Sequence, residues 1–306
     1  MVFLQNVIRS YLMNELYAID PNAVTSPNQL LGIIEKFRSS EGRFVAKFPD
    51  SWIDEIRQKI STGSLENTRI TEKLKFWTSS LLDVKTKYRN GDWLENAIQT
   101  QRDQQIFEMI LTTRNIDSKF IVELADVIDR HLIDLKDSRE AYVPANAKSY
   151  SRICDPLFKI SEEIVLYDYK FSTRFKLPSG ELKLDWQRIN VLEELIRGMI
   201  SQGRTQRFLI MFNEKTAMEF EEFIHIDLQD IASRIDPNNK IEVLYEFDDG
   251  RFDMASQHPR CIFSIKAGLR FDQGFQEFKT NDSNLVSWMN DISLRPFRMK
   301  FLKHFH

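Results

Sequence analysis

Residues 241 to 278 read IEVLYEFDDGRFDMASQHPRCIFSIKAGLRFDQGFQEF. Two strand-like runs, Ile241–Phe247 and Cys261–Ile265, flank a polar connection that brings His258 and Arg260 to the start of the second run. Side chains two residues apart in an extended segment point to the same side of the chain. The spacing therefore predicts that the imidazole and the guanidinium share one face, where the pair is suited to holding a phosphate.

Strand-like and helix-like runs alternate upstream of this stretch. The predicted strands are Glu163–Tyr169 and Arg207–Phe212, and the predicted helices are Ser149–Ile160, Trp186–Gln202 and Lys215–Arg234. This alternation is typical of right-handed crossovers and of a mostly parallel sheet with helices on both faces. We therefore expect residues 141–306 to form an α/β domain with a mostly parallel mixed sheet, followed by a basic tail that is helical in part over 285–293 and 296–306.

The first half shows apolar residues at helical spacing, interrupted by turn signals. The helices predicted on this basis are Val2–Tyr17, Asn28–Arg38, Trp52–Ile60, Ile70–Tyr88, Trp93–Gln101, Gln104–Leu111 and Ser118–Leu135. Ser26 and Pro27 supply the N-cap and first-turn proline of the second of these helices. The pattern loosens around Pro144, so the sequence predicts an all-α domain over residues 1–140 and a two-domain α+β protein overall.

Composition limits the possible functions. The chain has 306 residues, a net charge of −3 and a pI near 6.0, so no global charge attracts it to nucleic acid or to an anionic membrane. No G-x-G-x-x-G or Walker pattern occurs, and we expect no cofactor. The apolar runs are far shorter than the roughly 20 residues of a membrane span, and the first residues lack the apolar core of a signal peptide. With only two cysteines, Cys154 and Cys261, we expect a cytoplasmic protein with reduced thiols.

With this topology, the second half resembles the phospholipase-D-like fold over about residues 142–280. The segments that carry the resemblance are I-V-L-Y-D-Y-K-F-S from Ile164, R-F-L-I-M-F from Arg207 and G-L-R-F-D-Q-G-F from Gly268, which follows the histidine strand. The likeness is to the divergent branch with a single motif. That branch includes the C-terminal domain of MIT-domain proteins that act in membrane remodelling, and similar bacterial proteins, some with suspected roles in phage defence.

The resemblance implies roles for particular residues. Catalytic members carry His-x-Lys-x4-Asp, and the matching positions here are His258, Arg260 and, in place of the aspartate, Ile265. His258 corresponds to the nucleophile that attacks phosphorus and Arg260 to the clamp on the phosphate oxygens. Pro259 occupies the middle position, and the chain has a single motif where the reaction needs two histidines.

These departures favour a non-catalytic function. We expect a binding, adaptor or sensor subunit in a multi-subunit assembly with protein partners, such as a bacterial anti-phage defence complex. The alternative is a phosphodiesterase or nuclease that combines His258 and Arg260 from two chains of a homodimer. A third hypothesis assigns recognition to the helical domain and dimerisation to the α/β domain.

Other polar residues have two interpretations each. Asp168 and Lys170 end the first predicted strand of the second half, where ligands gather in open parallel sheets, so they are candidate phosphate or ligand contacts together with Arg260. The other interpretation is a local cap at the strand end. The acidic residues around Asp248 resemble a two-metal site and equally an ordinary turn, and we expect no metal there.

The tail from Arg295 to His306 alternates cations with phenylalanine and leucine. Its four cations are candidates for binding a partner or nucleic acid: Arg295, Arg298, Lys300 and Lys303. The other interpretation is a terminal helix that packs its aromatic face on the domain and leaves its lysines in solvent.

Overall fold

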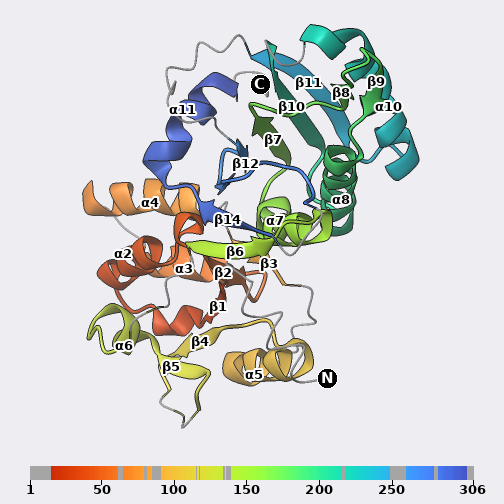
Figure 1. Ribbon diagram of the computed structural model, residues 1–306. Helices are drawn as coiled ribbons and strands as arrows, with labels where there is room; N and C mark the ends of the chain where they lie inside the picture. Colours follow the sequence, from red (N-terminus) through yellow and green to blue (C-terminus); the bar gives the residue numbers. More distant parts are fainter. Residues whose placement is uncertain are drawn as a thin grey trace. The chain divides into compact units, whose positions relative to one another are not determined.

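The computed structural model describes residues 15–60, 65–78, 81–84, 91–114, 116, 118–133, 135, 139–214, 218–248, 260–278 and 282–301. They form two compact units that divide between Arg139 and Glu140, next to the predicted boundary. His258, the predicted nucleophile, lies outside the described residues, and so do Pro259 and Lys303. Figure 1 shows the elements of both units.

The N-terminal unit is an α/β unit, so the prediction of an all-α domain is wrong. Its described residues include a parallel sheet in the order β3-β2-β1-β4-β5. The strands are β1 Glu15–Ile19, β2 Arg43–Lys47, β3 Leu82–Asp83, β4 Met109–Thr112 and β5 Ile121–Glu123. Each has two to five residues, and a buried run this short has no period that separates it from part of a helix.

Helices cover both faces of this sheet. They are α2 Pro27–Lys36, α3 Trp52–Ile60, α4 Leu65–Thr78, α5 Trp93–Gln104 and α6 Leu124–Ile128. The predicted cap of α2 is confirmed, because the Ser26 side chain accepts a hydrogen bond from the Gln29 amide at 3.2 Å and Pro27 opens the helix. The predicted helices at Trp52 and Trp93 are confirmed as well.

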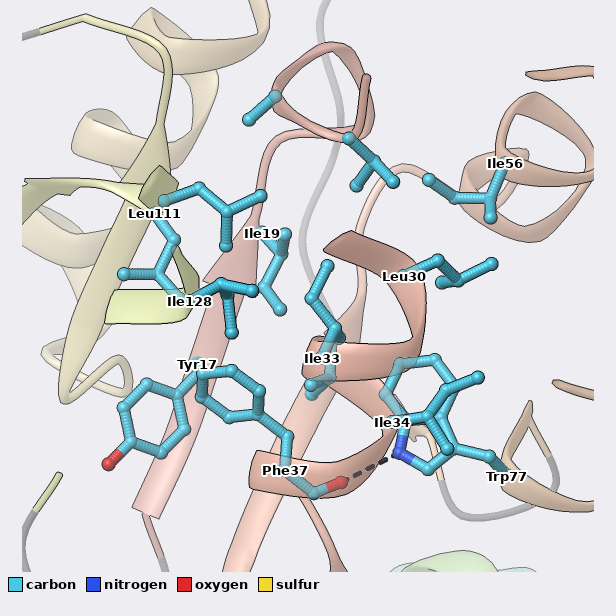
Figure 2. Close-up of a cluster of buried hydrophobic side chains, with 14 of the residues drawn as sticks. Tyr17, Ile19, Leu30, Ile33, Ile34, Phe37, Ile56, Trp77, Leu111 and Ile128 are labelled. Atoms are coloured by element: carbon cyan, nitrogen blue, oxygen red, sulfur yellow. Dashed lines mark hydrogen bonds between the residues drawn. The ribbon is translucent and has the colours of Figure 1, made fainter. Parts of the chain in front are cut away.

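The larger apolar cluster of this unit joins the sheet to α2, α3, α4 and α6. Figure 2 shows Tyr17 and Ile19 of β1 facing Ile33 and Phe37 of α2, with the Trp77 indole donating to the Phe37 carbonyl at 2.6 Å. A second cluster on the opposite face joins alternate strand residues, such as Ala18, to α5. The alternation of side chains along each strand thus fills two cores.

The C-terminal unit contains a mixed sheet with strand order β11-β10-β7-β12-β13-β14-β6 among the described residues. These strands are β6 Glu140–Pro144, β7 Glu163–Asp168, β10 Arg207–Asn213, β11 Glu242–Asp248, β12 Arg260–Phe263, β13 Gly268–Phe271 and β14 Ser283–Trp288. The pairings of β10 with β11 and β7 are parallel, and the other four pairings of this order are antiparallel. The expectation of a mostly parallel sheet is therefore wrong, although the three strands joined by helices are parallel as predicted.

Helices cover both faces of the C-terminal sheet. They are α7 Ala147–Ile160, α8 Trp186–Gln202, α10 Glu221–Ile235 and α11 Asp291–Phe301. Leu294 and Phe297 of α11 pack on one face, against a cluster that includes Val165 and Tyr167 of β7. On the other face, α7 and α8 approach closely at Gly198, where an added Cβ would lie 2.4 Å from Ser151 Oγ.

Two features of this unit differ from the expectation. Residues 285–293 were expected to be partly helical, but the strand β14 occupies most of this range and pairs with β6. The sequence pattern did not indicate this pairing. A hairpin of β8 Arg174–Lys176 and β9 Leu182–Leu184 precedes α8. Arg174 fastens this hairpin to α10 through hydrogen bonds of 2.7 and 2.9 Å to the buried Asp227 carboxylate.

Candidate functional site

The candidate site lies where β7 ends and β12 begins. Because these strands are antiparallel, the last residue of β7, Asp168, stands opposite the first residue of β12, Arg260. Residues directly opposite in a sheet project their side chains to the same face. Sheet pairing thus brings together two of the predicted ligand residues that are 92 positions apart in the sequence.

Asp168 is buried and holds the surrounding backbone. Its Oδ1 accepts a hydrogen bond from the Lys170 amide at 2.9 Å, and its Oδ2 accepts one from the Phe275 amide at 3.0 Å. The first bond is the local strand-end contact that the sequence allowed as an alternative. The second bond ties the end of β7 to the turn after β13. Hydrogen bonds from main-chain amides to an ionised carboxylate are strong, so this contact stabilises the turn.

Arg260 is held between two partners and remains partly exposed. Its Nη1 donates to the Asp272 carbonyl oxygen, and its Nε lies 3.9 Å from Asp168 Oδ1. The side chain remains 21% exposed. Within the described ranges, its Nη2 makes no hydrogen bond, and a guanidinium carries five N–H donors in all.

The turn that carries Asp272 depends on a glycine. Gly274 has a φ of +86°, and a Cβ there would lie 2.7 Å from Asp168 Oδ2 and 3.1 Å from Arg260 Cδ. Only glycine fits this close approach of the backbone to the acid and the guanidinium. The G-L-R-F-D-Q-G-F segment thus has a structural role that explains its second glycine.

A buried amide and a ring cluster fix the same turn. Asn284 of β14 accepts from the Gln273 amide at 3.0 Å and donates to the Gly274 carbonyl and to the Tyr150 hydroxyl, at 3.2 and 3.1 Å. The centroids of the Tyr150 and Phe275 rings lie 6.5 Å apart in an edge-to-face arrangement. Burial raises the pKa of Tyr150 to about 12, so its hydroxyl is protonated at neutral pH. The site therefore rests on a rigid frame.

The sequence pattern did not indicate Asn284 or Tyr150 as parts of this frame. Asn284 precedes a run that was assigned in part to a helix, and its role depends on the pairing of β14 with its neighbours. Tyr150 lies on the apolar side of a helix, where an aromatic residue is ordinary core. A sequence search for the partners of a Gly-Phe turn has no signal that would find either residue.

A second polar pair lies at the same end of the sheet on the opposite face. The Tyr167 hydroxyl donates to Asp248 Oδ2 at 2.6 Å, and both residues are buried. Burial, together with this hydrogen bond, raises the pKa of Tyr167 well above its ordinary value. Asp248, which the sequence offered as part of an acidic cluster, thus accepts from a phenol at the end of β11.

Within the described ranges, the other predicted ligand residues make no hydrogen bond or salt bridge with Arg260. Lys170 is exposed, and its ammonium has no partner in the part of the chain that the structure describes. On α11, Arg295 is exposed, whereas the Nε and Nη2 atoms of Arg298 are buried. Lys300 belongs to α11, and its side chain lies outside the described residues. Phe297 of the same helix packs into the core, which agrees with the interpretation of a docked terminal helix.

Comparison with known proteins shows no family for this chain. No family model matches it, and no curated protein does. A search of solved structures matches TrmBL2, an archaeal chromatin protein whose structure shows a novel mode of DNA binding. The two chains are 12% identical, the alignment covers 84% of this chain and 80% of that one, and the TM-score is 0.28. A TM-score this low carries no argument about fold or function.

No described helix is both long enough and apolar enough to cross a membrane. In the same residues, no group of three or more histidine, cysteine, aspartate or glutamate side chains is arranged to hold a metal ion.

Proposed function

We propose that this chain works by binding rather than by catalysis, and that its C-terminal unit holds an anionic, phosphate-bearing ligand at Arg260. The observation that carries the proposal is the state of the Arg260 side chain: the Asp272 carbonyl and Asp168 hold it, and 21% of it is exposed. A pre-positioned guanidinium loses little side-chain entropy when it binds an oxyanion, and its planar fork matches phosphate oxygens. The exposed Lys170, two residues beyond Asp168, adds a second cation near this end of the sheet.

Three features speak against hydrolysis. Arginine stays protonated in proteins and therefore takes no part in proton transfer. Both oxygens of Asp168 already accept main-chain amides, so this carboxylate serves the frame. The position of the missing aspartate is Ile265, whose exposed side chain has no group that could orient an imidazole. The proposal includes the resemblance to divergent phospholipase-D-like domains and, with it, a place in a multi-subunit assembly such as an anti-phage system.

The test measures binding of a fluorescein-labelled single-stranded oligonucleotide to the full chain by anisotropy at low salt, with inorganic phosphate as competitor. Arg260→Gln removes the proposed contact, and Arg270→Gln is the matched control because Arg270 is exposed on the neighbouring strand β13. We expect about tenfold weaker binding for Arg260→Gln, as for loss of one charge-assisted hydrogen bond, and less than about a threefold change for the control. Equal losses in both variants, or no binding by the wild type, would contradict the proposal.

The competing enzyme hypothesis is tested on the same samples. The oligonucleotide and a nitrophenyl phosphodiester are incubated with wild type, Arg260→Gln and His258→Ala, and cleavage products are separated by electrophoresis or read by absorbance. If the wild type cleaves the substrate and both substitutions abolish cleavage, the chain is a phosphodiesterase and the binding hypothesis is wrong. Intact substrate with all three proteins is the expected result.

A further inference from the structure

The outer face of α7 is lined by cations. Lys148, Arg152 and Lys159 are exposed, and they stand at positions i, i+4 and i+11 of the helix. With 3.6 residues per turn, these spacings place the three side chains within about 40° of one another around the helix axis. They therefore form one line of charge, the α7 stripe, which is about 16 Å long at 1.5 Å per residue.

Within the described ranges, the three cations of the α7 stripe make no salt bridge and no side-chain hydrogen bond. The neighbouring helices differ in this respect. On α8, Arg197 Nη1 lies 3.0 Å from Glu194 Oε1, and on α10, Arg234 Nη2 lies 2.6 Å from Glu193 Oε1. An anion can therefore approach the α7 stripe without first breaking an ion pair.

The carboxylates of Asp155 and Glu277 lie near the α7 stripe, and each is held by another group. Asp155 lies within the stripe, is half-buried and accepts a hydrogen bond from the Gln202 side chain of α8. Glu277, at the start of the helix, accepts a hydrogen bond from the Ala147 amide at 3.1 Å. Three cations against the one carboxylate of Asp155 leave the stripe with a net charge of +2.

The composition of this face indicates which anion it fits. Like charges at i, i+4, such as Lys148 and Arg152, destabilise a helix, so the fold gains nothing from them. The exposed residues of α7 are the three cations alone. A membrane surface holds a helix through apolar side chains that insert below the headgroups, and a partner protein buries an apolar core at its interface. A phosphate backbone needs only cations, so the α7 stripe favours nucleic acid.

The α7 stripe begins at the end of the sheet that carries Arg260. Tyr150 follows Lys148 by two residues, and its hydroxyl accepts a hydrogen bond from Asn284, which also donates to the Gly274 carbonyl beside Arg260. The other end of α7 leads into the first residue of β7, at the far end of the sheet. The stripe therefore runs away from the Arg260 site along the outside of the helix.

We propose that the α7 stripe binds the phosphate backbone of a nucleic-acid strand whose continuation lies at Arg260. This assignment rests on the proposed function, because it names the phosphate-bearing ligand as a polynucleotide that spans both places. Each cation releases counterions from a phosphate, so the affinity falls as salt rises. Phosphates are the same at every nucleotide, so these contacts position a strand without reading its sequence.

The test measures binding of a fluorescein-labelled single-stranded oligonucleotide to the full chain by anisotropy over a range of salt concentrations. Arg152→Gln/Lys159→Gln removes two cations of the stripe, and the charge-matched control Lys119→Gln/Lys240→Gln removes two exposed cations elsewhere. Each lost contact with a single strand lowers the slope of log affinity against log salt by about 0.7. We expect the stripe variant to lose about 1.4 of this slope and about tenfold in affinity at low salt, and the control to stay within about threefold.

A third variant tests the sign of the effect. Asp155→Asn removes the carboxylate of the stripe and keeps an oxygen that accepts a hydrogen bond from Gln202. We expect it to bind the oligonucleotide about threefold more tightly than wild type, because the stripe gains net positive charge. Weaker binding by this variant, once circular dichroism shows it to be folded, would overturn a contact based on charge.

The same measurements separate the α7 stripe from the Arg260 site. Equal binding by the stripe variant and its control would overturn the inference, and a loss confined to Arg260→Gln would leave the proposed function standing. A loss in the stripe variant with unchanged binding by Arg260→Gln would overturn the proposed function and the shared path. Vesicles containing phosphatidylserine are the last arm. If they bind wild type as tightly as the oligonucleotide does and the stripe variant loses this binding, a membrane occupies the stripe and the inference is wrong.

Discussion

Both units contain parallel strands, and they differ in what occupies the carboxyl ends of those strands. In the N-terminal unit, indole groups close the ends: Trp52 donates to the Ile19 carbonyl at 2.6 Å and Trp93 donates to the Phe48 carbonyl at 3.0 Å. Asp20, directly after β1, accepts from Thr112 at 3.1 Å. The strand-end groups of this unit are therefore satisfied by buried neighbours.

In the C-terminal unit, the corresponding end holds a guanidinium that is partly exposed. Arg260 is held by its neighbours, and its side chain is still 21% exposed. Strand ends in open sheets are the usual place for ligands, but only donors that remain accessible can bind one. The comparison indicates that the closed end is scaffold and the partly open end is the candidate binding site.

The largest expected effect tests the closed end. Trp52→Ala removes a fully buried indole whose ring centroid lies 5.9 Å from that of Trp77. The substitution also leaves the Ile19 carbonyl without its hydrogen-bond donor. We expect a loss of about 3–5 kcal/mol in the free energy of unfolding, measured by urea denaturation followed by circular dichroism. The matched control is Trp186→Ala, because Trp186 is 51% exposed and its loss should cost less than about 1 kcal/mol. Equal losses would show that the indole does not close this end.

The next effect tests the frame of the partly open end. Gly274 and Gly180 both have a φ of +86°, but an added Cβ meets Asp168 and Arg260 only at Gly274, with nothing within 4 Å at Gly180. Both alanine variants bear the same backbone strain, so their difference isolates the clash. We expect Gly274→Ala to be about 1–3 kcal/mol less stable than Gly180→Ala and to bind the oligonucleotide more weakly. If the two variants have the same stability and the same affinity, the close approach of Gly274 to Asp168 and Arg260 does not hold the site together.

The last effect is confined to alkaline pH. The pKa of Tyr150 is raised to about 12, so between pH 10 and 12 the folded chain keeps a proton that the unfolded chain releases. Stability therefore falls as the pH rises through this window, by roughly 1.4 kcal/mol per pH unit for this group. Tyr150→Phe should flatten the decline, measured by denaturation at several alkaline pH values. Tyr142→Phe, at a side chain that is 65% exposed, is the control and should leave the slope unchanged.

The sequence predicted several helices well and the short strands poorly. Where it predicted one helix over Ser118–Leu135, the structure has the strand β5 followed by the short helix α6. The helices at Trp52, Trp93 and Trp186 show sustained apolar spacing, and the structure confirms them. The predicted helix Gln104–Leu111 is wrong, because α5 ends at Gln104, its C-cap Gln105 has a φ of +51°, and β4 begins at Met109. A left-handed residue other than glycine gives no stop signal, so tertiary packing alone decides this boundary.

The sequence indicated two residues of the candidate site, but it did not indicate the contacts that hold them in place. Asp168 and Arg260 stand at the ends of strands that the pattern shows, and the structure places them opposite each other. Their partners are main-chain groups of Phe275 and Asp272, which depend on strand register and on a turn held by Asn284. Main-chain groups are common to every residue, so no side-chain pattern identifies these contacts.

The pairing of β6 with β14 has a consequence for synthesis of the protein. The first strand of the C-terminal unit, from Glu140, finds its neighbour only at Ser283–Trp288, and α11 follows with Leu294 and Phe297 of the core. A nascent chain on the ribosome lacks these parts until nearly all of this unit has emerged. Such high contact order slows folding and exposes unpaired strand edges to chaperones in the meantime. A premature stop before residue 283 would leave β6 without the strand it pairs with.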